Sequence, residues 1–167
     1  MTTKRLEDGP ADTASAGTKP VVTPAAAQAT DPIPGPSPAA IVDSLYRIHD
    51  NGRGPVLTQE SGKVHDRFFD STLAALFMQN LIGPPNGEVS NLDFDPFYNA
   101  QEMGIKNFAI GDATITGDSA VVVVTFDNFD RKERLAYQLR GKPQGWKIRN
   151  IVYGDGDDLL TTLRKPW

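Results

Sequence analysis

Four strand-like runs in the second half of the chain constrain its fold more strongly than any other feature. The runs are rich in β-branched and aromatic residues, and short turn signals such as the Gly-Asp pair at 117–118 separate them. They cover residues 105–116, 120–126, 132–139 and 146–153. The run at 120–126 is almost continuously apolar, which predicts a central strand covered on both faces. No helical pattern interrupts the last three runs, so we expect neighbouring antiparallel strands.

Helical segments precede these runs. Ser37 is a good N-cap, and Pro38 fits the first helical position, where its missing N–H costs nothing. An apolar stripe then predicts a helix that ends near residues 49–51. A second and broader stripe predicts one long helix over residues 63–81, which would supply the main helical part of the core.

Two shorter helices are also expected. Asp95 can cap the first, Pro96 fits its first position, and Gly104 can close it in a left-handed conformation. The second would close the chain and would be capped by Asp157 or Asp158. Its apolar side is formed by Leu159, Leu160 and Leu163.

This order of elements predicts an α+β fold in which helices are followed by a strongly curved antiparallel sheet that forms a cone. The first forty residues hold seven of the thirteen prolines and no aromatic residue. Such a segment buries too little apolar surface to offset the entropy of ordering it. We therefore expect a disordered Ala/Pro-rich arm over residues 1–37 and a single α+β domain over residues 38–167.

Composition excludes several classes of function. The net charge of −4 offers no basic surface for a phosphate backbone, so we expect no nucleic-acid partner. The absence of cysteine excludes disulfides and thiolate chemistry. No segment approaches transmembrane length, and the chain as given shows no signal peptide. The acids Asp155, Asp157 and Asp158 lack the spacing of a calcium loop, so they indicate turns and caps rather than a metal site.

Two segments carry a family resemblance. The first is 93–102, Asp-Phe-Asp-Pro-Phe-Tyr-Asn-Ala-Gln-Glu, and the second is 145–153, which begins Gly-Trp-Lys-Ile. On these motifs the chain resembles the nuclear transport factor two-like superfamily, and within it a bacterial, often exported family of unknown function. The resemblance implies the cone fold, a periplasmic or secreted location and a possible homodimer. Arg149 and Asn150 stand where that family would have an acidic pair, and the resemblance implies no activity.

Seven residues are candidates for contact with a ligand. Asp93 and Asp95 could present two carboxylates to a pocket, as a base and an acid. The others have polar tips that could reach a cavity between helix and sheet: Tyr98, Gln101, Tyr137, Trp146 and Tyr153. Each also has a structural interpretation, because Asp95 can be a cap, Asp93 can bond within a loop, and the aromatic residues can belong to the core.

The two histidines give no sign of chemistry. His49 lies at a predicted helix end, where the helix dipole favours it. His65 is followed by Asp66 near a helix start, and neither histidine belongs to an HExxH pattern. We expect no cofactor and no bound metal.

Three functions remain open. The leading hypothesis is a non-enzymatic binding domain for a small apolar molecule or a protein partner. The first alternative is an isomerase- or dehydratase-type enzyme that uses a pocket carboxylate as base, with Tyr98 or Tyr137 stabilising an enolate. The second alternative is an inhibitor or immunity protein that acts on an envelope enzyme.

Overall fold

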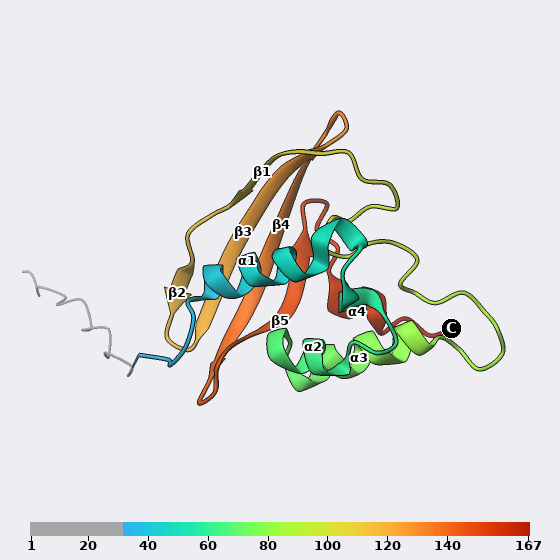
Figure 1. Cartoon of the computed structure of the whole chain (residues 1–167), viewed down its shortest axis with the longest axis horizontal. Helices are drawn as coiled ribbons and strands as arrows, with labels where there is room; N and C mark the ends of the chain where they lie inside the picture. The colour runs from blue at the N-terminus through green and yellow to red at the C-terminus, as the bar shows by residue number, and fades with distance from the viewer. Residues whose placement is uncertain (1–31) are drawn as a thin grey trace, which may run out of the picture.

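The computed structural model describes residues 32–167, and the predicted arm lies outside this range except for its last six residues. Helices and 3₁₀ turns come first, and the sheet and a last helix follow (Figure 1). The helical elements are α1 (Pro38–His49), η1 (Asp50–Gly52), η2 (Pro55–Leu57), α2 (Gly62–Phe68), α3 (Ser71–Ile82) and α4 (Leu159–Leu163). The strands are β1 (Ile105–Ile110), β2 (Thr114–Thr116), β3 (Ser119–Asn128), β4 (Arg131–Lys142) and β5 (Gly145–Tyr153). The predicted α+β class is confirmed.

All strand pairs in the sheet are antiparallel, and β3, β4 and β5 are consecutive neighbours as predicted. β1 and β2 both pair with β3. The predicted single strand over 105–116 is therefore two strands, because the chain leaves the ladder at 111–113. None of the helices in the described part of the chain is long and apolar enough to cross a membrane.

The predicted burial of β3 is wrong. Its residues alternate between buried and accessible positions along the whole strand, although valine fills both kinds of position from 121 to 124. Val122 and Val124 lie in the core, whereas Val121 is 38% exposed. A continuous apolar run can therefore mark a strand with only one covered face, because β-branched residues also suit an exposed pleated surface.

Helix α1 forms as predicted, with the Ser37 hydroxyl accepting a hydrogen bond from the backbone N–H of Ala40 at 3.2 Å. The predicted helix over 63–81 is instead split into α2 and α3. Phe69 leaves the helix to bridge with Ile148 at the edge of β5, and the Asp70 N–H donates to the Ile148 carbonyl at 2.9 Å. The Asp70 carboxylate then caps α3 through the backbone N–H of Leu73.

The helix predicted after Asp95 does not form. Asp95 and Ala100 instead exchange two backbone hydrogen bonds and close a tight loop. Asn99 takes a positive φ of 50° inside this loop, which no α-helix tolerates. The Asp95 carboxylate still accepts a hydrogen bond from the backbone N–H of Phe97, so its capping role is retained in a turn rather than in a helix.

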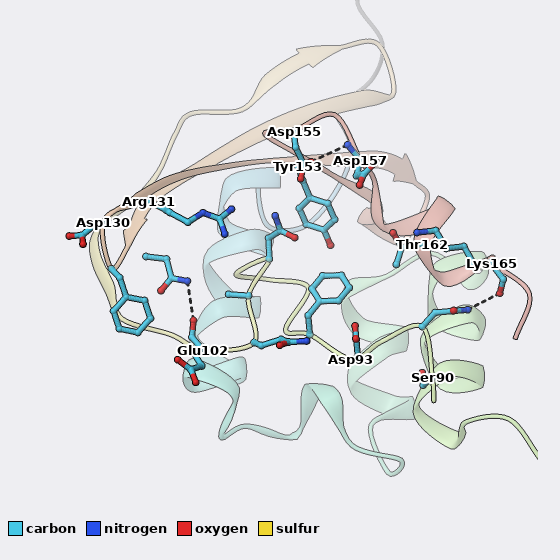
Figure 2. A pocket seen from close by; sticks show the side chains of 17 residues that line it. Ser90, Asp93, Glu102, Asp130, Arg131, Tyr153, Asp155, Asp157, Thr162 and Lys165 are labelled. Atoms are coloured by element: carbon cyan, nitrogen blue, oxygen red, sulfur yellow. Dashed lines mark hydrogen bonds between the residues drawn. The ribbon is translucent and has the colours of Figure 1, made fainter. Parts of the chain in front are cut away.

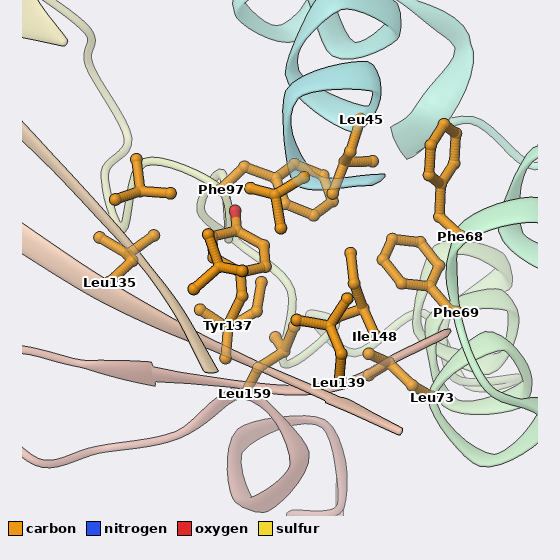
Figure 3. Packing of buried hydrophobic residues seen from close by; sticks show 14 of the residues in the cluster. Leu45, Phe68, Phe69, Leu73, Phe97, Leu135, Tyr137, Leu139, Ile148 and Leu159 are labelled. Atoms are coloured by element: carbon orange, nitrogen blue, oxygen red, sulfur yellow. The ribbon is translucent and has the colours of Figure 1, made fainter. Parts of the chain in front are cut away.

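The core lies between the helices and one face of the sheet (Figure 3). Three buried aromatic rings occupy the space between α1 and the strands: Tyr137 from β4, Tyr46 from α1 and Phe97 from the loop. Tyr137 donates to the Tyr46 hydroxyl at 2.8 Å, and Tyr46 donates to the Phe97 carbonyl at 2.7 Å. This chain of hydrogen bonds joins sheet, helix and loop through a closely packed interior.

Candidate functional site

A wide cleft of about 940 Å³ opens where the loop after α3, the β3–β4 hairpin and the chain after β5 meet (Figure 2). Three segments form its walls, together with residues of α4 and the C-terminal segment. The residues that line it are Ser90, Asn91, Asp93, Phe94, Asn99, Ala100, Gln101, Glu102, Asn128, Phe129, Asp130, Arg131, Tyr153, Asp155, Asp157, Thr162 and Lys165. Polar side chains therefore dominate a concave surface that faces solvent.

Negative charge predominates in this cleft. Five carboxylates line it, and none of them forms an ion pair within residues 32–167: Asp93, Glu102, Asp130, Asp155 and Asp157. Of the two cations, Arg131 is held by the buried Glu133 at 2.9 Å, which leaves Lys165 as the other positive group in the lining. A cationic group brought to this surface would neutralise charges that now repel one another.

The floor of the cleft is rigid. The Tyr153 ring is buried, and its hydroxyl donates to the Pro96 carbonyl at 3.2 Å. Phe94 meets this ring edge-on at 6.2 Å between centroids. Burial, and then the charge of Asp95, raise the pKa of Tyr153 far above its ordinary value, so this hydroxyl stays neutral.

One wall of the cleft is fixed by Asn128. Its side-chain oxygen accepts from the backbone N–H of Gly104 at 2.7 Å, and its amide group donates to the Glu102 carbonyl at 3.0 Å. These two bonds attach the β3–β4 hairpin to the loop before β1. The wall is thus held in place before any partner arrives.

The seven predicted contact residues do not gather at one site. Asp93, Gln101 and Tyr153 line the cleft. Tyr98 and Tyr137 are buried in the core, where burial raises the pKa of both hydroxyls, that of Tyr98 to about 12. Trp146 is buried away from the cleft, beside Gly117 and residues 32–38.

Asp95 forms a buried pair with His49 instead of lining the cleft. The His49 Nε2 and the Asp95 Oδ2 lie 2.6 Å apart, and the His49 ring has no exposed surface. The His49 ring also contacts Phe97 edge-on, with centroids 4.7 Å apart. His49 ends α1 as predicted, but the sequence did not indicate its pairing with Asp95, which attaches α1 to the loop that follows Asp95.

A second buried pair looks like a catalytic dyad and is not one. The Ser61 hydroxyl lies 3.0 Å from His65 Nε2, but this nitrogen also lies 2.7 Å from the Val56 carbonyl. Because a carbonyl only accepts, Nε2 carries the proton and cannot remove one from Ser61. Ser61 is also buried, and burial lowers the pKa of His65. The pair binds α2 to η2.

The structure describes no metal centre: residues 32–167 contain no group of three or more His, Cys, Asp or Glu side chains placed to hold an ion. Sequence reasoning did not single out Asn128 or Phe129, which shape the cleft wall. An available signal was the Asn-Phe-Asp-Arg turn between two strand runs, since two-residue hairpin loops favour Asn, Asp and Gly and rarely accept Phe.

Comparisons with known proteins support the fold. The chain is similar to a chain in the crystal structure of the type VI native effector–immunity complex Tae3–Tai3 from Ralstonia pickettii, with a TM-score of 0.50 and 24% sequence identity. The match covers 71% of this chain and 95% of that chain. No family model and no curated protein matches the sequence. At this level of identity the likeness shows a shared fold.

Proposed function

We propose that this protein binds and inhibits a protein partner, in the manner of the immunity member of an effector–immunity complex. The inhibitor or immunity alternative is therefore preferred to a binding domain for a small apolar molecule. The observation that carries the proposal is the contrast between a packed interior and an open, unneutralised polar cleft. The fold likeness to the Tae3–Tai3 complex supports it.

The interior argues against a small apolar ligand. A ligand of this kind would need the space between α1 and the sheet, where the rings of Tyr46, Tyr137 and Phe97 lie. The two tyrosine hydroxyls are already bonded to one another, and that of Tyr46 is bonded to the Phe97 carbonyl. Displacing them would leave buried polar groups without partners, at a cost of about 1–3 kcal/mol for each group.

The interior also argues against the isomerase or dehydratase alternative. A general base must be reachable by its substrate. The charge of Asp95 acts on the buried tyrosines, but His49 and the Phe97 N–H already occupy its two oxygens. Asp93 lines the open cleft, and the lining of that cleft includes neither Tyr98 nor Tyr137, the tyrosines proposed to act with it.

The cleft suits a protein surface. Five carboxylates that are unpaired within residues 32–167 steer a basic loop toward a wall that is already fixed, which raises the association rate and lowers the entropy lost on binding. A basic element of the effector would therefore enter the cleft. The NTF2-like cone, the envelope location and a homodimer remain predictions beside this proposal.

Native mass spectrometry of the full chain with the effector Tae3 tests the proposal. We expect a complex with Tae3 and no small molecule retained by the chain alone. The complex should weaken in the triple variant Asp93→Asn, Glu102→Gln, Asp157→Asn. The matched control neutralises three exposed acids outside the cleft: Glu60→Gln, Asp66→Asn and Asp112→Asn. A stoichiometric small ligand, with no Tae3 complex, would contradict the proposal.

A further inference from the structure

We infer that Phe129, at the tip of the β3–β4 hairpin, is the apolar anchor of the effector interface. It would insert into an apolar pocket of the effector whose rim carries lysine or arginine. The inference rests on the proposed function and names the partner chemistry at the same cleft. Four observations about this residue and its surroundings lead to it.

The first observation is exposure. Phe129 lines the cleft, and 57% of its surface is accessible to solvent. A phenylalanine that stays exposed at a hairpin tip buries little apolar surface, so it gains little hydrophobic stabilisation for the fold. Aromatic anchors of protein interfaces have this character: large, apolar and accessible before the partner arrives.

The second observation is backbone strain. Asn128 pairs with Arg131, so the hairpin loop has two residues, Phe129 and Asp130. Of these two, Phe129 has the positive φ, 54°. Hairpins with a positive φ at the first loop position favour glycine there, because an L side chain crowds the backbone. The chain thus places an aromatic ring where local geometry favours glycine.

The third observation is rigidity. The Phe129 N–H donates to the Gly104 carbonyl at 3.1 Å, and the ring lies against the Gly104 Cα. A Cβ added at Gly104 would lie 2.5 Å from the ring atom Cε1. Together with the two bonds made by Asn128, these contacts hold the ring in one orientation. A ring that is already ordered loses little entropy on binding.

The fourth observation is charge. Asp130 follows Phe129 in the chain and Glu102 shares its cleft lining, and neither carboxylate forms an ion pair within residues 32–167. An effector pocket that encloses Phe129 would bring its rim close to these carboxylates. Complementary potentials therefore require basic residues on that rim. An apolar centre with a charged border is the arrangement in which a buried anchor contributes most.

Binding of Tae3 to immobilised full-length chain, measured by biolayer interferometry, tests the inference with three variants. Phe129→Gly removes the ring and the strain. Gly104→Ala keeps the phenylalanine side chain but forces its ring to turn away from residue 104. Gly104 has no positive φ, so alanine fits its backbone. Ile115→Ala is the matched control, since Ile115 is 54% exposed on β2, outside the cleft.

We expect Phe129→Gly and Gly104→Ala to bind at least about tenfold more weakly, and Ile115→Ala to bind like the wild type. The melting temperature of Phe129→Gly should equal or exceed that of the wild type. Wild-type affinity in Phe129→Gly would overturn the inference and leave the proposed function standing. A melting temperature lower by more than about 5 °C would also overturn it, because the ring would then be structural. Failure of the wild type to bind Tae3 would overturn the proposed function, and the inference with it.

Discussion

Removing the Tyr46 hydroxyl should change the sign of the effect that removing the Tyr137 hydroxyl has on the free energy of unfolding. Tyr46→Phe leaves two buried groups without partners, the Tyr137 hydroxyl and the Phe97 carbonyl. Each such group costs about 1–2 kcal/mol, so the free energy of unfolding should fall by about 2–4 kcal/mol. Tyr137→Phe removes a donor but leaves the bond from Tyr46 to Phe97 intact, and should cost about 1 kcal/mol.

The double variant separates this account from simple loss of contacts. On the Tyr46→Phe background, Tyr137→Phe removes an unpaired hydroxyl and should restore about 1 kcal/mol of stability. The same substitution is therefore destabilising in the wild type and stabilising in the single variant. Urea unfolding followed by tryptophan fluorescence measures all four proteins. Additive losses in the double variant, within about 0.5 kcal/mol, would refute the hydrogen-bonded chain.

Three further outcomes are expected. Burial raises the pKa of all four tyrosines above their unfolded value of 10.0. The free energy of unfolding should therefore be fully present below pH 10 and fall above it, by up to about 1.4 kcal/mol per pH unit for each tyrosine. Tyrosinate absorbance that appears near pH 10 in folded protein would count against this. Gly54→Ala should lower the free energy of unfolding by about 3 kcal/mol or more, because a Cβ there overlaps the Ile48 carbonyl; a near-normal melt would refute the close approach. Asp70→Ala should cost about 1 kcal/mol by removing the α3 cap, whereas Asp70→Asn should cost less, and equal losses in thermal melts would argue against capping.

The antiparallel sheet and the first helix could be predicted because their signals are local. Ser37 followed by Pro38 marks a helix start, and alternation with short turns marks consecutive strands. The break between α2 and α3 could not be predicted in this way. The apolar stripe continues through this region, but the helix breaks at Phe69 and Asp70 because they pair with Ile148, which lies far away in the sequence.

The candidate site was predictable only in part. Asp93 was chosen as a carboxylate, and Gln101 and Tyr153 were chosen as polar-tipped residues; all three line the cleft. The position of Asp95 depends on its pairing with His49, a contact that depends on the folded loop and has no sequence signature. Single residues thus carry the chemistry of a site, whereas tertiary contacts decide which of them meet.

Hydrogen–deuterium exchange of the full chain, with and without the effector Tae3, tests the central claim most directly. The account predicts protection of the cleft walls on binding, at residues 90–104, 128–131 and 153–157. It predicts unchanged exchange at the β2–β3 turn, around residues 117–118. Protection confined to that turn or to the accessible face of β3, or no protection at all, would contradict it.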